Sequence, residues 1–308
     1  MRKPRALRAG DTVRVVSPAS PLPEEKLAAM EELLRAQGLR VAYGRHALGS
    51  QDYFAGSDKE RAADLQQAFD DPDCAAVLCS RGGYGCARLM RMLDLDRMAG
   101  SGKMLLGYSD ITTLHLALLR RGLATVYSPM SITFHTPREP WVYQSFLAVL
   151  SGGNPIPPEA PRARTITPGI AEGEVTGGCL CLLTDSLATP DLLDARGKIL
   201  IIEDVDEQPH RVDAMFTHLL LAGVLESAAG IAVGEMTHTD EQCDPLIGSR
   251  PWEDIVRERI APLGIPAVVG FPFGHMQAML TLPLGIRARL DADAGTLTYL
   301  ESICDASR

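Results

Sequence analysis

Three side chains of this sequence have the types that nucleophilic acyl transfer requires: a serine, a histidine and a carboxylate. Ser109 lies in Gly107-Tyr-Ser-Asp-Ile111, Glu203 follows the apolar run 198–202, and His275 lies in a loop rich in glycine and proline. A serine hydroxyl attacks a carbonyl at neutral pH only when a base removes its proton, and histidine, with a pKa of about 6.5, suits that role. A carboxylate can hold the imidazole in the required tautomer. We therefore expect Ser109 as nucleophile, His275 as base and Glu203 as orienting acid.

The stretch around Ser109 indicates how this serine would be positioned. Residues 103–107 are typical of a short buried strand, and apolar residues then recur at helical spacing from Ile111 until Gly122. A serine between such a strand and helix presents its Oγ to a substrate, and N–H groups at the helix start can stabilise an oxyanion. The pattern resembles a nucleophile elbow without the second glycine of G-x-S-x-G. The alternative is that Ser109 only caps the helix.

Glu203 and His275 also have structural alternatives. Glu203 could solvate the strand end and support the helix that begins near Pro209, and a single loop histidine is usually incidental. Both residues are candidates because they lie, together with Ser109, at the ends of predicted strands, where parallel sheets carry their functional groups.

A glycine-rich loop, Arg81-Gly-Gly-Tyr-Gly85, follows another predicted strand. Its backbone N–H groups, at Gly82 and Gly83, could bind a tetrahedral oxygen together with the amide of Asp110. The Arg81 guanidinium could bind a substrate carboxylate, or form a structural ion pair instead. A phosphate-binding loop is the rival interpretation, but the sequence has no G-x-G-x-x-G and no G-K-[ST].

Metal chemistry has little support in the sequence. There is no H-E-x-x-H motif and no C-x-x-C pair. One local cluster of possible ligands lies in the polar loop 235–251, comprising His238, Asp240, Cys243 and Asp244. We expect neither a metal nor another cofactor.

Composition limits the class of protein. The 308 residues allow two medium domains, and the net charge of -9 argues against nucleic acid or an anionic membrane surface as the partner. The basic N-terminus lacks the apolar region of a secretory signal, and no segment could span a bilayer. Seven scattered cysteines match no disulfide framework. We expect a cytoplasmic protein.

The order of predicted elements indicates an α/β protein. Apolar strands alternate with helices from residue 13 to 127, which predicts an open parallel, flavodoxin-like sheet covered on both faces. We expect an N-terminal domain at 1–152, a Gly- and Pro-rich linker at 153–166, and a mixed α/β domain at 167–308, with the active site between the domains.

Details of several elements follow from the same patterns. We expect helices at 86–93 and 179–187, a turn at Gly177-Gly178, and a closing hairpin formed by 287–290 and 296–300.

Five ordered segments carry a resemblance to a known family. They are residues 5–20, Ser80-Arg-Gly-Gly-Tyr-Gly85, Gly107-Tyr-Ser-Asp110, Ile202-Glu-Asp204, and Gly274-His275 through Thr281-Leu-Pro-Leu-Gly285. Together they resemble the LD-carboxypeptidases, serine peptidases whose family also contains the microcin C self-immunity hydrolases. The resemblance runs nearly end to end.

The resemblance implies roles for these residues. Ser109 matches the family's nucleophile, His275 its general base and Glu203 the orienting acid, while the Gly82-Gly83 loop and the Asp110 amide match the oxyanion hole. Family members remove the terminal D-alanine of murein tetrapeptides in cytoplasmic cell-wall recycling and are commonly homodimers. A murein tetrapeptide or related small peptide is thus the expected substrate, and a second copy the expected partner.

The sequence departs from the family pattern at two positions. Gly177-Gly-Cys179 stands where the family commonly has Gly-Gly-Asn, and Ala214 follows Asp213 where an arginine is frequent. Two other functions therefore remain: a hydrolase of peptidyl or aminoacyl nucleotides with the same triad, and a non-catalytic module that binds an anion at Arg81–Gly85.

Overall fold

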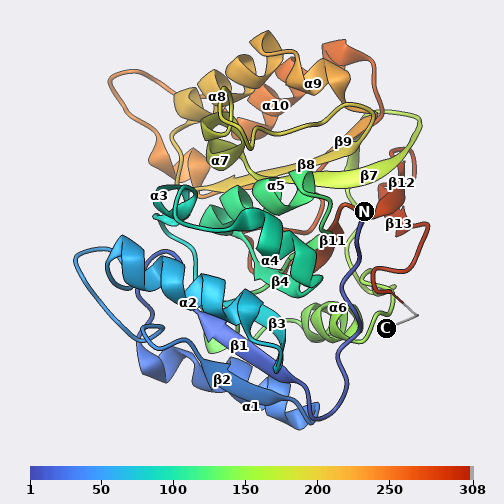
Figure 1. Ribbon diagram of the computed structural model, residues 1–308. Coiled ribbons are helices and arrows are strands. Elements are labelled where there is room, and N and C mark those ends of the chain that lie inside the picture. Colours follow the sequence, from blue (N-terminus) through green and yellow to red (C-terminus); the bar gives the residue numbers. More distant parts are fainter. Residues whose placement is uncertain (306–308) are drawn as a thin grey trace. The chain divides into compact units, whose positions relative to one another are not determined.

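The computed structural model describes residues 1–305, and the chain forms two compact units. The first unit comprises Met1–Pro155, Thr281–Gly285 and the C-terminal segment from Ser302, and the second comprises Ile156–Leu280 and Ile286–Glu301. The first unit is thus completed by a short segment that returns from late in the chain. Figure 1 follows the chain by colour and labels its elements.

The first unit is built on a six-stranded sheet, ordered β11-β5-β4-β3-β1-β2. Its strands are β1 (Thr12–Val16), β2 (Arg40–Tyr43), β3 (Cys74–Cys79), β4 (Met104–Gly107), β5 (Thr125–Tyr127) and β11 (Leu282–Leu284). The strands β1 to β5 pair in parallel, whereas β11 pairs antiparallel with β5. The order 2-1-3-4-5 is that of flavodoxin-like sheets, which confirms the expected fold class.

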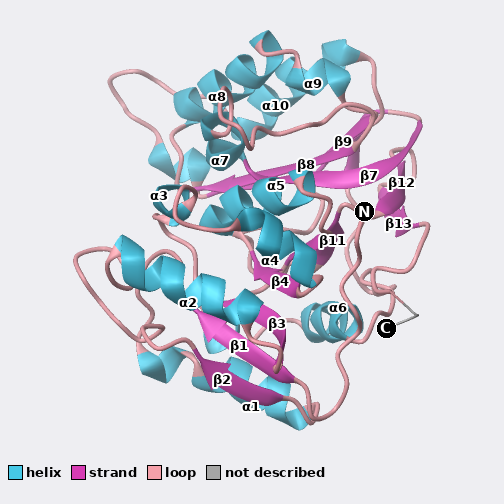
Figure 2. Cartoon of the chain, viewed as in Figure 1, coloured by secondary structure: helices cyan, strands magenta, loops and turns pink. Residues whose placement is uncertain are grey.

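Helices connect these strands, as Figure 2 shows by colour. They are η1 (Glu24–Lys26), α1 (Ala28–Ala36), α2 (Asp58–Asp70), α3 (Cys86–Leu89), α4 (Leu95–Ser101), η2 (Ser109–Ile111), α5 (Thr112–Arg120), η3 (Thr133–His135) and α6 (Pro140–Leu150). The helix α2 begins with a capping box between Ser57 and Glu60 and packs against β1 and β3. Buried apolar side chains from α2, α4, α5 and the sheet form one core.

The second unit has a seven-stranded mixed sheet, ordered β13-β12-β7-β8-β9-β10-β6. Its strands are β6 (Arg164–Thr167), β7 (Ile170–Cys179), β8 (Ile199–Val205), β9 (Gly230–Thr237), β10 (Ala267–Val269), β12 (Arg287–Asp291) and β13 (Thr296–Tyr299). The central strands β7 to β10 are parallel, while β6, β12 and β13 pair antiparallel. The predicted hairpin is therefore present as β12 and β13.

Helices of the second unit pack together around α8. They are α7 (Leu180–Asp185), α8 (Pro209–Leu221), α9 (Val224–Ser227), η4 (Thr239–Gln242), α10 (Trp252–Ile260) and η5 (Ala261–Leu263). In the described part of the chain, no helix combines the length and apolar character that crossing a membrane requires.

The turn predicted at Gly177-Gly178 is wrong. Both glycines lie inside β7, paired with Ile201 and Ile202 of β8. A Cβ at Gly177 would collide with the carbonyl oxygen of Ile201, so glycine is needed there because two backbones approach closely, not because the chain reverses. The following helix accordingly starts at Leu180 and ends at Asp185.

Other differences concern short or polar elements. The helix predicted at 86–93 is only the single turn Cys86–Leu89. The sequence patterns also missed α10, whose many charged residues leave few apolar positions, and β11, whose three residues give no readable alternation.

Candidate active site

Ser109 lies at a sharp turn between β4 and α5, as its sequence predicts. Its φ is +64°, a left-handed conformation that costs a serine free energy and is typical of strained positions at functional sites. Gly107 makes the turn compact, since a Cβ there would lie 2.9 Å from Cγ1 of Ile111. This turn therefore has the backbone strain of a nucleophile elbow.

The glycine loop of the first unit lies against Ser109. A Cβ at Gly82 would be 2.8 Å from the Ser109 Cβ, 2.9 Å from its Oγ and 3.3 Å from the Asp110 nitrogen. Gly83 has a φ of +106°, and a Cβ there would collide with the hydroxyl of Ser20. The backbone of Gly82 thus lies close to the Ser109 hydroxyl, with the Asp110 amide nitrogen near both.

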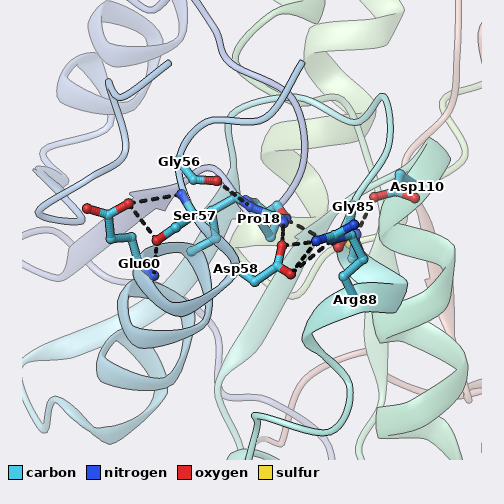
Figure 3. Close-up of polar contacts among 10 residues, drawn as sticks. Pro18, Gly56, Ser57, Asp58, Glu60, Gly85, Arg88 and Asp110 are labelled. Carbon is cyan, nitrogen blue, oxygen red and sulfur yellow. Dashed lines mark hydrogen bonds and ion pairs between the residues drawn. The ribbon is translucent and has the colours of Figure 1, made fainter. Parts of the chain in front are cut away.

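A buried arginine, Arg61, binds backbone carbonyls at the end of this loop. Arg61 is 2% exposed and donates hydrogen bonds to the carbonyls of Pro18, Gly56 (3.1 Å) and Gly85 (3.2 Å). Its charge is paired with Asp58, and the acceptors of these bonds are labelled in Figure 3. Because a buried guanidinium needs all these partners, it holds three chain segments together at the end of the loop.

Asp110 connects the same loop to the serine turn. Its carboxylate is 1% exposed, and Oδ2 accepts the backbone N–H of Cys86 at 2.8 Å. Figure 3 shows Asp110 close to Gly85. The side chain therefore joins the start of α3 to the residue that follows Ser109, a role that the sequence analysis missed.

His115 and Tyr127 also position the serine turn, and the sequence analysis did not identify either as functional. Nε2 of His115 donates to the Gly107 carbonyl at 2.9 Å, and burial lowers the pKa of this histidine to about 4, so the ring is neutral. The Tyr127 hydroxyl accepts the backbone N–H of Ser109 at 3.3 Å. The available signal was that His115 lies on the apolar face of the helix that follows Ser109.

In the second unit, Glu203 and His275 form a close pair. The strand β8 continues beyond the predicted 198–202 to Val205, so Glu203 lies inside it and is 0% exposed. Its Oε2 lies 2.7 Å from Nδ1 of His275 and also accepts the His275 backbone N–H at 3.1 Å. A carboxylate acceptor at Nδ1 favours the tautomer with a proton on Nδ1 and leaves Nε2 to act as a base.

The close contact between Glu203 and His275 requires a glycine at position 274. Its φ is +99°, and a Cβ would lie 2.5 Å from the Glu203 Cδ. The glycine therefore allows the loop backbone to reach the buried carboxylate.

The charge of Glu203 changes the acid–base behaviour of His275. Burial alone lowers the pKa of the imidazole, but the attraction of the Glu203 carboxylate and its hydrogen bond outweigh burial, and the pKa of His275 rises above its ordinary 6.5. The pair thus stabilises an imidazolium, the species that a histidine base becomes after it takes a proton.

The remaining predicted site residues have individual contacts. Arg81 donates to the carbonyl of Pro21 at 3.3 Å and, among the described residues, forms no ion pair, contrary to the structural alternative. In the polar loop, Asp240 accepts the N–H of Trp252, and Asp244 accepts that of Leu246.

Models of a known family match both halves of the chain. The LD-carboxypeptidase N-terminal domain matches residues 13–128, and the LD-carboxypeptidase C-terminal domain matches residues 172–290. The chain belongs to the LD-carboxypeptidase family of peptidases. The family membership suggested by the five sequence segments is thereby confirmed.

Relatives across the LD-carboxypeptidase family match nearly the whole chain. The "Probable murein peptide carboxypeptidase" of Bacillus subtilis is 37% identical, over 94% of this chain and 91% of its own. The murein tetrapeptide carboxypeptidase of Pseudomonas aeruginosa is 31% identical, over 91% of this chain and 93% of its own. Among solved structures, MccF in complex with glutamyl sulfamoyl guanosine has a TM-score of 0.88 at 25% identity, covering 99% of this chain and 100% of that one.

Proposed function

We propose that this LD-carboxypeptidase family member is a serine carboxypeptidase that removes the terminal D-alanine from murein tetrapeptides. The observation that carries the proposal is the buried Glu203–His275 hydrogen bond of 2.7 Å, which prepares an imidazole to act as a base. The strained turn at Ser109 supports the assignment of the nucleophile, since an exposed helix-capping serine needs no left-handed backbone. The names of the relatives from B. subtilis and P. aeruginosa support a murein peptide as the substrate.

In the proposed reaction, Ser109 Oγ attacks the carbonyl carbon of the bond to D-alanine. His275 Nε2 accepts the hydroxyl proton, while Glu203 holds Nδ1 and stabilises the imidazolium. The amides of Gly83 and Asp110 stabilise the negative charge on the tetrahedral oxygen. His275 then protonates the departing amine, and D-alanine leaves. Water next attacks the acyl-enzyme while His275 takes a proton from it, and His275 returns that proton to Ser109 Oγ.

Arg81 is the proposed binder of the substrate's terminal carboxylate. It directly precedes the glycine loop that lies against Ser109, and no acidic side chain in the described residues neutralises its charge. A guanidinium binds a carboxylate with two parallel hydrogen bonds, which gives orientation as well as affinity.

Active-site labelling tests the proposal directly. We expect a fluorophosphonate to modify Ser109 and to abolish cleavage of L-Ala-D-Glu-meso-diaminopimelate-D-Ala, followed as release of D-alanine. Ser109→Ala should lose both labelling and cleavage, whereas Ser151→Ala, at the exposed end of α6, should keep both. An unlabelled Ser109 in a folded protein that still binds anions would instead support the non-catalytic module.

The second candidate is the hydrolysis of aminoacyl nucleotides, because MccF, with a TM-score of 0.88, binds glutamyl sulfamoyl guanosine. The same labelled protein distinguishes the two. A higher kcat/KM for an aminoacyl adenylate than for the tetrapeptide would replace the murein proposal while keeping the triad.

We further propose that the protein acts in the cytoplasm as a homodimer during cell-wall recycling. A light-scattering mass near twice the 33.2 kDa of one chain is expected at micromolar concentration. A mass near 33.2 kDa throughout that range would reject the dimer.

A further inference from the structure

Two cysteines and an aspartate meet in the second unit, on a different set of side chains from the Glu203–His275 pair. Cys179 is the last residue of β7, and Cys181 lies in the first turn of α7. Asp204 follows Glu203 in β8, the neighbouring strand. In the sequence, Cys179 is recognisable only as a departure from the family pattern.

The three ligand groups lie close together. The sulfurs of Cys179 and Cys181 are 3.4 Å apart, and the Cys179 sulfur is 3.5 Å from Oδ1 of Asp204. One ligand atom from each residue can be chosen so that all of them lie within 4.8 Å of one another. Within residues 1–305, no other group of three such residues meets this condition.

The carboxylate of Asp204 is buried and held in place. It is 2% exposed, Oδ2 accepts the backbone N–H of Cys181 at 2.8 Å, and Oδ1 accepts that of Val205 at 2.8 Å. In the described part of the chain, no lysine, arginine or histidine forms an ion pair with it. Buried carboxylates are normally paired with a cation or coordinate a metal, so we expect a positive charge beside Asp204.

We propose that Cys179, Cys181 and Asp204 bind one divalent cation of the zinc class. Thiolate and carboxylate ligands together favour Zn²⁺ over Mg²⁺ or Ca²⁺, which prefer oxygen alone. With Zn–S bonds of about 2.3 Å and Zn–O of about 2.0 Å, a tetrahedral ion separates two sulfurs by about 3.8 Å and a sulfur from an oxygen by about 3.5 Å. The sulfur–sulfur separation and the separation between Cys179 and Asp204 differ from these values by a few tenths of an ångström at most.

Binding conserves charge in this region. One Zn²⁺ enters and the two thiols release one proton each, so the net charge beside Glu203 stays the same. Cys181 is partly exposed, unlike Cys179 and Asp204, and so the fourth position of the ion, taken by water, lies on its side. Because the net charge is unchanged, an ion at this site is compatible with the proposed catalysis.

Cobalt spectroscopy tests the site without reference to activity. The whole protein, reduced with a phosphine and treated with a chelator, is titrated with Co²⁺. We expect thiolate-to-cobalt charge-transfer absorption and tetrahedral d–d bands that saturate at one ion per chain and disappear when Zn²⁺ is added. Cys181→Ser should weaken binding at least tenfold, whereas Cys243→Ser, an exposed cysteine outside the cluster, should leave the spectrum unchanged.

Alkylation of the unmodified protein provides a second measurement. Zn²⁺ should protect Cys181 from iodoacetamide, while Cys243 continues to react, as mapped by mass spectrometry. Absence of the charge-transfer band in wild-type protein, or the same band in folded Cys181→Ser, would overturn the proposal. Loss of hydrolase activity alone would bear only on the proposed function, because neither readout requires turnover.

Discussion

Oε2 of Glu203 accepts two hydrogen bonds from His275, one from Nδ1 at 2.7 Å and one from the backbone nitrogen at 3.1 Å. The second bond fixes the loop and the first fixes the ring, so one buried oxygen determines both the place and the tautomer of the imidazole. Because the carboxylate also raises the pKa of His275, the pair predicts a specific pH dependence.

On the acidic side of the pH profile, where kcat/KM rises with pH, the half-maximal value should lie above pH 6.5. His275 must be neutral to accept a proton, and its raised pKa keeps it protonated to a higher pH than an ordinary histidine. Glu203→Gln should shift this half-maximal point to lower pH and reduce kcat by roughly 10²- to 10⁴-fold, less than Ser109→Ala or His275→Ala. A pH–rate profile for the tetrapeptide measures both effects, and an unshifted half-maximal point in Glu203→Gln would contradict the pairing of these residues in catalysis.

Gly274→Ala should remove most activity through the same pair. The new Cβ would lie 2.5 Å from the Glu203 Cδ, so either the carboxylate or the loop must move. Gly248→Ala is the matched control, since its φ of +86° gives comparable backbone strain with no atom within 4 Å. We expect the control to lose about 1 kcal/mol of unfolding free energy and to keep its activity. Equal activities of the two variants would show that Glu203 tolerates displacement.

Gly82→Ala should impair the reaction from the side of Ser109. Its backbone φ is ordinary, so the effect comes from a methyl group 2.9 Å from the nucleophile oxygen. Displacing a reacting group by about 1 Å can cost about 10²-fold in rate, and we expect at least that loss in kcat/KM. Gly100→Ala, inside α4 with only one atom near 3.8 Å, should be neutral or slightly stabilising. Normal turnover by Gly82→Ala would exclude a close role for this loop.

Tyr127→Phe tests the support of the serine turn. It removes the hydroxyl that accepts the Ser109 N–H at 3.3 Å, and we expect about tenfold lower kcat with little change in KM. Tyr143→Phe makes the corresponding change elsewhere, where the hydroxyl accepts the Arg138 N–H at 3.2 Å. Both variants should lose about 1 kcal/mol of unfolding free energy, but only the first should lose activity. Steady-state kinetics with parallel thermal melts separates the two effects.

Arg81→Ala should abolish the preference for a free terminal carboxylate. The wild-type protein should cleave the tetrapeptide at least tenfold faster, by kcat/KM, than its C-terminal amide, because the amide leaves the guanidinium without its anionic partner. Arg35→Ala, on the exposed surface of α1, should retain the full preference. If wild-type protein cleaves acid and amide equally well, Arg81 does not bind the substrate carboxylate.

The amino-acid sequence alone was enough to predict the five parallel strands β1 to β5 of the first unit and the turn at Ser109. Apolar, β-branched strands alternate with amphipathic helices there, and these periodicities depend only on residues close in the chain. The residue types at Ser109, Glu203 and His275 suggested acyl-transfer chemistry, and their joint catalytic role stays a prediction for the experiments above.

Contacts between distant residues were decided by the tertiary structure. Glu203 and His275 are 72 residues apart, and only the pairing of β8 in its sheet and the left-handed Gly274 bring Nδ1 to the carboxylate. Likewise, the sequence suggests a turn at Gly177, whereas the structure shows that the glycine allows the backbone of β8 to approach closely. Side-chain chemistry and local periodicity are properties of the sequence, whereas the separation of two groups, their burial and hence their pKa depend on how the whole chain packs.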